Sequence, residues 1–280
     1  MDRIEFPALE VNEINATRDA LQAYSKIPGN WLKACRAQRK HWWHISLRPS
    51  LRGVTTGVVY TDTVDFEVEL DLQASSLSAK TSAGQVLDID LHGQPAAEPE
   101  AQLCSFLLDA GVPPESAPPT GDATQAFDDY SIEQAQNLGR TLAGVSAVLD
   151  SMRAGIREET SPLGLWPHHF DLAMLWLPGD KIPGQDPTDA EYADVQMNFG
   201  FTFGDELVPE PYFYTTAYPL SEGFPARELG GGAEWFSDGF TGMVWRYERL
   251  LDAADPGAAL LAQWQCLLDE GRQKMANQSA

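Results

Sequence analysis

Apolar residues recur every third or fourth position in several parts of this chain, which is the spacing of one face of a helix. The clearest stretch covers residues 131–158, where Ser131 and Gln134 also fit the capping pattern of a helix start. Further helices are predicted over residues 17–27, 31–40, 99–110, 240–251 and 256–268. We expect Pro28 and Gly29 to end the first of these helices, because proline removes a backbone donor and glycine favours a helix end.

Elsewhere apolar and polar residues alternate, which is typical of antiparallel strands with one face on a core. The alternation predicts strands over residues 42–48, 65–72, 87–91, 170–176, 192–203 and 211–218. Residues 82–85 are expected to form a hairpin turn, with Gly84 supplying an unusual backbone angle.

These elements predict an α+β protein with a largely antiparallel β-sheet and helices packed on one face. We expect one domain over residues 1–280. Residues 41–111 and 164–252 repeat the order of strands followed by a helix, so they are interpreted either as two echoed β-meander-plus-helix halves or as a chance similarity. The proline-rich stretch 112–122 is the expected connection between them.

The charge of the chain narrows the classes of partner. Its 280 residues carry a formal charge of −22, which disfavours nucleic acid and anionic membrane surfaces as partners. One stretch is locally basic, and we interpret it as a solvated helix face or as a docking patch for an acidic partner. Its residues are Lys26, Lys33, Arg36, Arg39, Lys40, Arg48 and Arg52.

Cysteine usage and the first residues bear on the compartment. Three widely spaced cysteines give no support for a disulfide framework or a cysteine zinc site. The first residues do not match a signal peptide, and no apolar run is long enough to span a bilayer. We therefore expect a cytoplasmic protein.

Familiar catalytic motifs are absent from the sequence, which leaves the polar side of the predicted strands as the candidate site. There is no nucleophile elbow, phosphate loop, dinucleotide fingerprint or zinc-protease motif. Residues two apart on a strand share a face, so Asp171 is placed to orient His169. His169 and Asp171 are the candidate acid/base pair.

Four further residues are candidate ligand-binding groups, and Arg48 among them would hold an anionic group. They are His44, Arg48, Asn198 and Tyr214. A metal site formed by His44, His169 and a carboxylate is a weaker alternative, and we do not predict a resident metal or a particular cofactor. A third interpretation is that the polar face is solvated and has no function.

Seven segments, taken in order, resemble a bacterial family known only as a domain of unknown function. They are HWWH (41–44), RGVTT (52–56), FEVELD (66–71), TSAG (81–84), HFDLA (169–173), FGFTFG (199–204) and PYFYTTAYP (211–219). The resemblance covers roughly residues 10–270 and implies a cytosolic bacterial protein, but it implies no activity or catalytic residue. The residues leave two hypotheses: a small-ligand-binding protein or enzyme that uses the polar sheet face, or a non-catalytic interaction or structural protein. In the second, exposed aromatic side chains and the acidic strand over residues 65–71 would dock a partner or a second copy.

Overall fold

The computed structural model describes residues 4–119, 121, 123–225 and 228–275, and their strands form two antiparallel sheets. The smaller sheet has the order β1-β2-β3-β4-β5. Its strands are β1 (Arg48–Pro49), β2 (Gly53–Thr55), β3 (Phe66–Asp71), β4 (Ser76–Thr81) and β5 (Val86–Asp90).

The larger sheet has the order β11-β12-β10-β9-β8-β6, with β7 also pairing with β8. Its strands are β6 (Glu159–Thr160), β7 (Gly164–Trp166), β8 (Asp171–Leu177), β9 (Gln196–Thr202), β10 (Tyr212–Tyr218), β11 (Glu234–Phe236) and β12 (Gly242–Arg246). The α-helices are α1 (Val11–Cys35), α2 (Ala97–Asp109), α3 (Ile132–Ala154), α4 (Tyr247–Leu250) and α5 (Pro256–Lys274). Two 3-10 turns, Lys40–Trp42 and Pro114–Ser116, complete the described elements.

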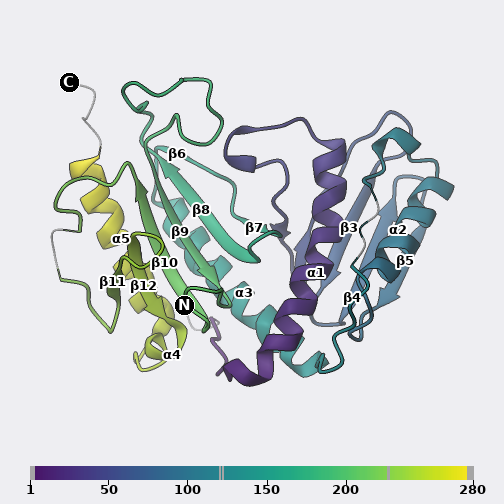
Figure 1. Ribbon diagram of the computed structural model, residues 1–280, viewed down its shortest axis with the longest axis horizontal. Coiled ribbons are helices and arrows are strands. Elements are labelled where there is room, and N and C mark those ends of the chain that lie inside the picture. Colours follow the sequence, from purple (N-terminus) through teal and green to yellow (C-terminus); the bar gives the residue numbers. More distant parts are fainter. Residues whose placement is uncertain (1–3, 120, 122, 226–227, 276–280) are drawn as a thin grey trace.

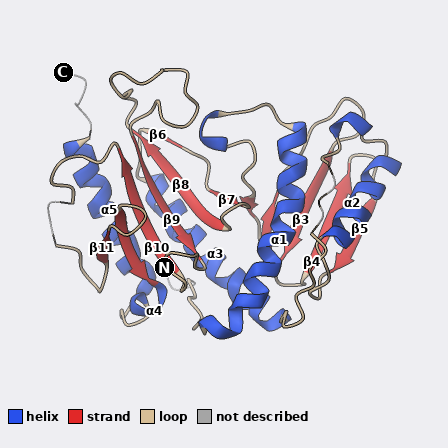
Figure 2. Cartoon of the chain, in the orientation of Figure 1, coloured by secondary structure: helices blue, strands red, loops and turns tan. Residues whose placement is uncertain are grey.

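The two sheets lie side by side, with α1 in front of the smaller sheet and α3 passing behind (Figure 1). A backbone bridge between Leu47 and Leu165 joins the start of the smaller sheet to β7. One cluster of buried apolar side chains includes residues of both sheets and of helices α1, α3 and α5. Figure 2 shows α3 and α5 behind the larger sheet, while the front face of β8, β9 and β10 carries no described helix.

The predicted fold class, α+β with antiparallel sheets, is confirmed. Buried and half-buried residues alternate along β3, as its sequence predicts. The predicted long helix is α3, and the Ser131 side chain accepts a hydrogen bond from the Gln134 backbone N–H. The predicted turn joins β4 to β5, with Gly84 at a φ of 85°.

Helix α1 contradicts the predicted stop at Pro28 and Gly29. It runs on to Cys35 and includes the residues that were predicted to start a second helix. Ile27, Trp31 and Leu32 are buried around the proline, and this burial offsets the lost backbone hydrogen bond. Gly29 has a packing role, because a Cβ there would lie 2.9 Å from Cγ of Pro167.

The predicted strand over residues 42–48 is also wrong. Residues Lys40–Trp42 form a 3-10 turn, and only Arg48 of that stretch is in a strand. His41 and Trp42 have φ angles of 51° and 57°, the left-handed region that side chains other than glycine rarely adopt. The alternation rule therefore gives no information about where His44 points.

The predicted helix over residues 240–251 is instead strand β12 followed by the short helix α4. Gly242, Met243, Val244 and Trp245 are all buried, because β12 lies inside the sheet with both faces covered. A strand buried on both faces shows a continuous apolar run rather than alternation. Such a run also contains apolar residues at helical spacing, so it can be mistaken for a helix.

Part of the predicted proline-rich connection, Thr120 and Asp122, lies outside the described residues. Among the residues that are described, no helix combines the length and apolar character needed to cross a bilayer.

Candidate functional site

The open face of the larger sheet presents aligned rows of side chains from β8, β9 and β10. In the first row Asp171 pairs with Thr202, which pairs with Tyr212. In the next row Gly200 lies between Ala173 and Tyr214. The register therefore places polar groups of three strands on one surface.

Two adjoining cavities lie on this face, and together we call them the sheet groove. The first has a volume of about 380 Å³ and is lined by His169, Asp171, Asn198, Thr202, Asp205, Tyr212, Tyr214, Thr216 and Phe240. The second has a volume of about 250 Å³ and is lined by His41, Trp42, Trp166, His168, His169, Asp171, Ala173, Leu175, Glu191, Tyr192, Gln196 and Asn198. His169, Asp171 and Asn198 line both cavities, so they occupy the middle of the groove.

Tyr214 reaches across β9 to contact Asp171 on β8. Its hydroxyl donates a hydrogen bond to Oδ2 of Asp171 at 2.5 Å. The ring passes directly over Gly200, where an added Cβ would lie 2.4 Å from the Tyr214 hydroxyl oxygen. Glycine at position 200 is thus what allows residues on two non-adjacent strands to meet.

Two acceptor oxygens of residues that line the groove have no hydrogen-bond partner among the described residues. They are Oδ1 of Asp171 and Oδ1 of Asn198, and both are shielded from solvent. Burial raises the pKa of the Asp171 carboxyl above its ordinary value, and the hydrogen bond from Tyr214 and the charge of His169 lower it only in part. Burial and the neighbouring Asp171 charge raise the pKa of Tyr214, which stays a neutral donor.

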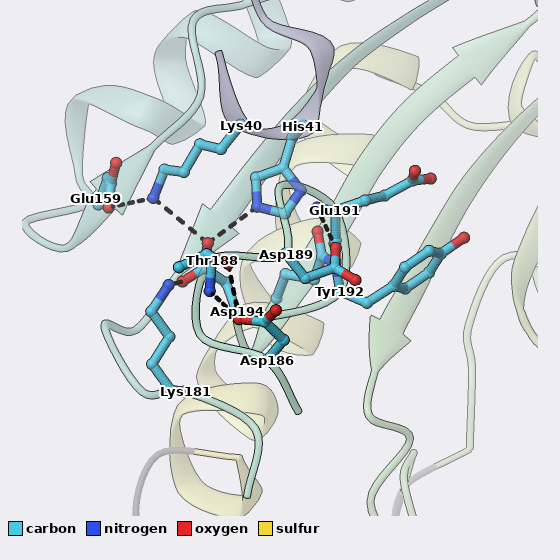
Figure 3. A network of polar contacts seen from close by, with 11 residues as sticks. Lys40, His41, Glu159, Lys181, Asp186, Thr188, Asp189, Glu191, Tyr192 and Asp194 are labelled. Atoms are coloured by element: carbon cyan, nitrogen blue, oxygen red, sulfur yellow. Dashed lines mark hydrogen bonds and ion pairs between the residues drawn. The ribbon is translucent and has the colours of Figure 1, made fainter. Parts of the chain in front are cut away.

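A cluster of charged side chains around Asp194 includes His41, which lines the second cavity of the groove (Figure 3). Asp194 accepts contacts from Nε2 of His41 at 3.1 Å, Nζ of Lys181 at 2.6 Å and Nζ of Lys40 at 3.5 Å. Burial acts to raise the pKa of Asp194, but its bonds to Lys181 and His41 lower it overall. The buried carboxylate ties the loop after β8 to the left-handed turn at His41.

The structure brings four of the six predicted site residues together in the first cavity. These are His169, Asp171, Asn198 and Tyr214. The predicted hydrogen bond between Asp171 and His169 is not formed, since Asp171 uses Oδ2 for Tyr214 and its Oδ1 is unpartnered. The His169 ring instead lies against His168, with ring centroids 4.4 Å apart.

His44 and Arg48 do not line the sheet groove. His44 is buried, accepts a hydrogen bond from the Arg39 backbone N–H at 3.3 Å, and stacks on Trp42. Arg48 donates to the Leu163 carbonyl at 3.3 Å, and burial lowers its pKa to about 10. Both placements were based on the strand predicted over residues 42–48, which does not form.

Several residues of the groove were not predicted as site residues. They are Thr202, Asp205, Tyr212, Thr216 and Phe240. Tyr212 and Thr216 each lie two residues from Tyr214 on β10 and so share its face, and the same alternation rule would have found them. Asp205 and Phe240 come from loops, where no periodicity exists to place them.

Metal-binding and disulfide chemistry find no support in the described part of the chain. It contains no group of three or more histidine, cysteine or acidic side chains arranged to hold a metal ion. No disulfide joins Cys35, Cys104 and Cys266.

Comparison with known proteins places the chain in a family. No curated protein and no solved structure matches it significantly. A family model described as "Family of unknown function (DUF5996)" matches residues 6–275, which is nearly the whole chain. The resemblance to a family of unknown function is confirmed by this match, and the chain belongs to the DUF5996 family.

Proposed function

We propose that this protein binds a small organic cation in the sheet groove. The observation that carries the proposal is the pair of shielded, unpartnered acceptor oxygens on Asp171 and Asn198 in the groove wall. A buried acceptor without a partner costs free energy, so a ligand that donates hydrogen bonds to both oxygens would recover it.

The composition of the first cavity supports a cationic ligand. Asp171 and Asp205 are its acidic groups, and Tyr212, Tyr214 and Phe240 supply aromatic surface. Carboxylates and aromatic faces both attract organic ammonium groups. A positive charge beside Asp171 would also offset the burial that raises the pKa of its carboxyl.

The arrangement supports binding better than proton transfer. His169 and Asp171 share the cavity, but no hydrogen bond joins them among the described residues, which favours binding over proton transfer. We also propose a cytoplasmic location, which is supported by three cysteines that form no disulfide.

The competing hypothesis, a non-catalytic interaction protein, has less support. That hypothesis uses exposed aromatic side chains and the acidic strand β3 as docking surfaces, but three carboxylates of β3 are engaged by neighbours. Glu67 accepts from Thr55, Glu69 accepts from Ser50, and Asp71 pairs with Arg52.

The proposal is tested by titration calorimetry at pH 7 with benzylamine, an aromatic cation, and with benzyl alcohol, its uncharged counterpart. We expect saturable binding of benzylamine, at least tenfold tighter than that of benzyl alcohol. Asp171→Asn should weaken benzylamine binding about tenfold or more, because a charge-assisted hydrogen bond is lost.

Asp88→Asn is the matched control, because it removes the same charge from an exposed position of β5. Its affinity for benzylamine should equal that of the wild type. Equal affinity for the two probes, or equal loss in both variants, would refute the proposal.

A further inference from the structure

A third cavity, separate from the centre of the sheet groove, lies where α1 meets the turn before β8. We call it the α1 cavity. Its volume is about 340 Å³, and it is lined by Lys26, Gly29, Asn30, Lys33, Trp42, Ile45, Pro167 and His168. It shares Trp42 and His168 with the sheet groove but none of the groove's central residues.

Three polar side chains of α1 face this cavity from one stripe of the helix. Lys26, Asn30 and Lys33 are spaced four and three residues apart, which brings them onto the same side. Neither lysine forms an ion pair with any described residue. Two ammonium groups thus border one hollow with no carboxylate bound to them.

The surroundings of the α1 cavity are positive, although the whole chain has a formal charge of −22. Burial lowers the pKa of His44, and the charges of Lys33 and Arg36 lower it further. Arg36 donates to backbone carbonyls of Thr56 and Val58 rather than to an acid.

Two acidic residues approach the cavity, and both have other contacts. Glu100 is buried, accepts the Gly121 backbone N–H at 2.9 Å and contacts Asn30 only at 3.5 Å. Glu191 contacts the Trp42 indole N–H at 3.5 Å, from the side of the sheet groove. Neither carboxylate neutralises the two lysines.

The remaining wall of the cavity is flat and apolar. Trp42 keeps 40% of its surface exposed, which is unusual for so large an apolar side chain. Its ring stacks on the buried His44, with ring centroids 5.8 Å apart and planes at 27°, so it is held in place from behind. Ile45 and Pro167 extend the apolar surface.

We propose that the α1 cavity binds a small organic anion with a flat apolar group, its charge held by Lys26 and Lys33 and its ring against Trp42. Ammonium groups bind carboxylates and phosphates as point charges, and an exposed indole face adds stacking surface. This site is independent of the cation proposed for the sheet groove.

The test is titration calorimetry of the full chain with phenyl phosphate, and with benzylamine as the cation of similar shape. We expect saturable binding of phenyl phosphate that weakens at least tenfold in the double variant Lys26→Gln/Lys33→Gln. Trp42→Ala should weaken it by a similar factor, and it keeps the proposal testable if the lysine variant is unstable. Lys80→Gln, which removes an exposed charge from β4, is the matched control and should bind as the wild type does.

Asp171→Asn separates the two sites, since it should weaken benzylamine binding about tenfold or more and leave phenyl phosphate binding unchanged. The proposal fails if phenyl phosphate does not saturate, or if Lys26→Gln/Lys33→Gln binds it as Lys80→Gln does. It also fails if only an acidic polymer such as polyglutamate binds to the lysines, since the patch would then dock an acidic protein segment rather than a small molecule.

Discussion

Asp171 is a shielded carboxylate whose described hydrogen bond comes from a neutral group, Tyr214. Such a group destabilises the folded chain in its charged form, because its desolvation is not offset by a cation. In the proposed cation site, this residue therefore trades some stability for binding. Gly200 serves the same contact, because its missing side chain leaves the space that the Tyr214 ring occupies.

Asp171→Asn should therefore stabilise the free protein. Burial raises the pKa of Asp171, so the folded state binds the carboxyl proton more tightly than the unfolded state does. The free energy of unfolding therefore falls as the pH rises from the ordinary carboxyl pKa through the raised pKa. At pH 7 we expect the variant to gain about 1 kcal/mol in the free energy of unfolding, a typical single-substitution effect. Urea unfolding at several pH values measures it, and the gain should shrink toward pH 5. A variant less stable than the wild type at pH 7 would show that the carboxylate is stabilising as it stands.

Gly200→Ala should displace Tyr214 from Asp171. The new Cβ would overlap the Tyr214 ring and hydroxyl, so the ring must move or the strands must shift. We expect a loss of about 1–3 kcal/mol in stability, the usual cost of overpacking, and about tenfold weaker benzylamine binding. Gly155→Ala is the control, because that glycine is exposed and its nearest neighbour lies 3.5 Å from an added Cβ. If Gly200→Ala binds benzylamine as well as Gly155→Ala does, the contact between Tyr214 and Asp171 has no part in binding.

Strands and helices differ in how far the sequence determines them. Periodicity predicts β3 and the start of β9, where buried and half-buried residues alternate. It also predicts β8 and β10, although every residue of β8 after Asp171 is buried. It fails for β12, which is buried on both faces, and for residues 40–47, where tertiary contacts hold two residues in the left-handed region. The same distinction explains the site: Asn198 and Tyr214 were predicted on regular strands, whereas His44 and Arg48 were placed on a strand that does not form.

The Asp194 cluster is the contact that fixes the irregular turn at His41. Two consecutive left-handed residues are each strained by roughly 1–2 kcal/mol, and the bond from His41 to Asp194 helps to hold them (Figure 3). The backbone N–H of His41 also donates to the Ala190 carbonyl at 2.6 Å. This element therefore depends on a distant loop rather than on local propensity.

Asp194→Ala should loosen both the turn and the loop before β9. Removing a buried carboxylate leaves His41 and Lys181 without their partner, so we expect a loss of about 3 kcal/mol in the free energy of unfolding. Urea unfolding and limited proteolysis of residues 178–194 measure the two effects. Asp186→Ala, an exposed acid that caps a turn of the same loop, should cost far less. Equal losses in the two variants would mean that the cluster does not hold the turn.

Across the whole molecule, two sheets share one cluster of buried side chains and leave one sheet face open. The sequence predicts the fold class and the polarity of that face, because both follow from alternation. It does not predict the division into two sheets, since strand pairing depends on contacts between distant segments. The acidic groove and the basic α1 cavity meet at Trp42 and His168, so charges of opposite sign are separated along one continuous surface.

A crystal structure of the protein with benzylamine would show where the cation lies. We predict its nitrogen within hydrogen-bonding distance of Oδ1 of Asp171 and Oδ1 of Asn198, with its ring against Tyr212 or Phe240. A well-occupied amine elsewhere on the chain, with both oxygens still unpartnered, would contradict the assignment of the sheet groove as a cation site.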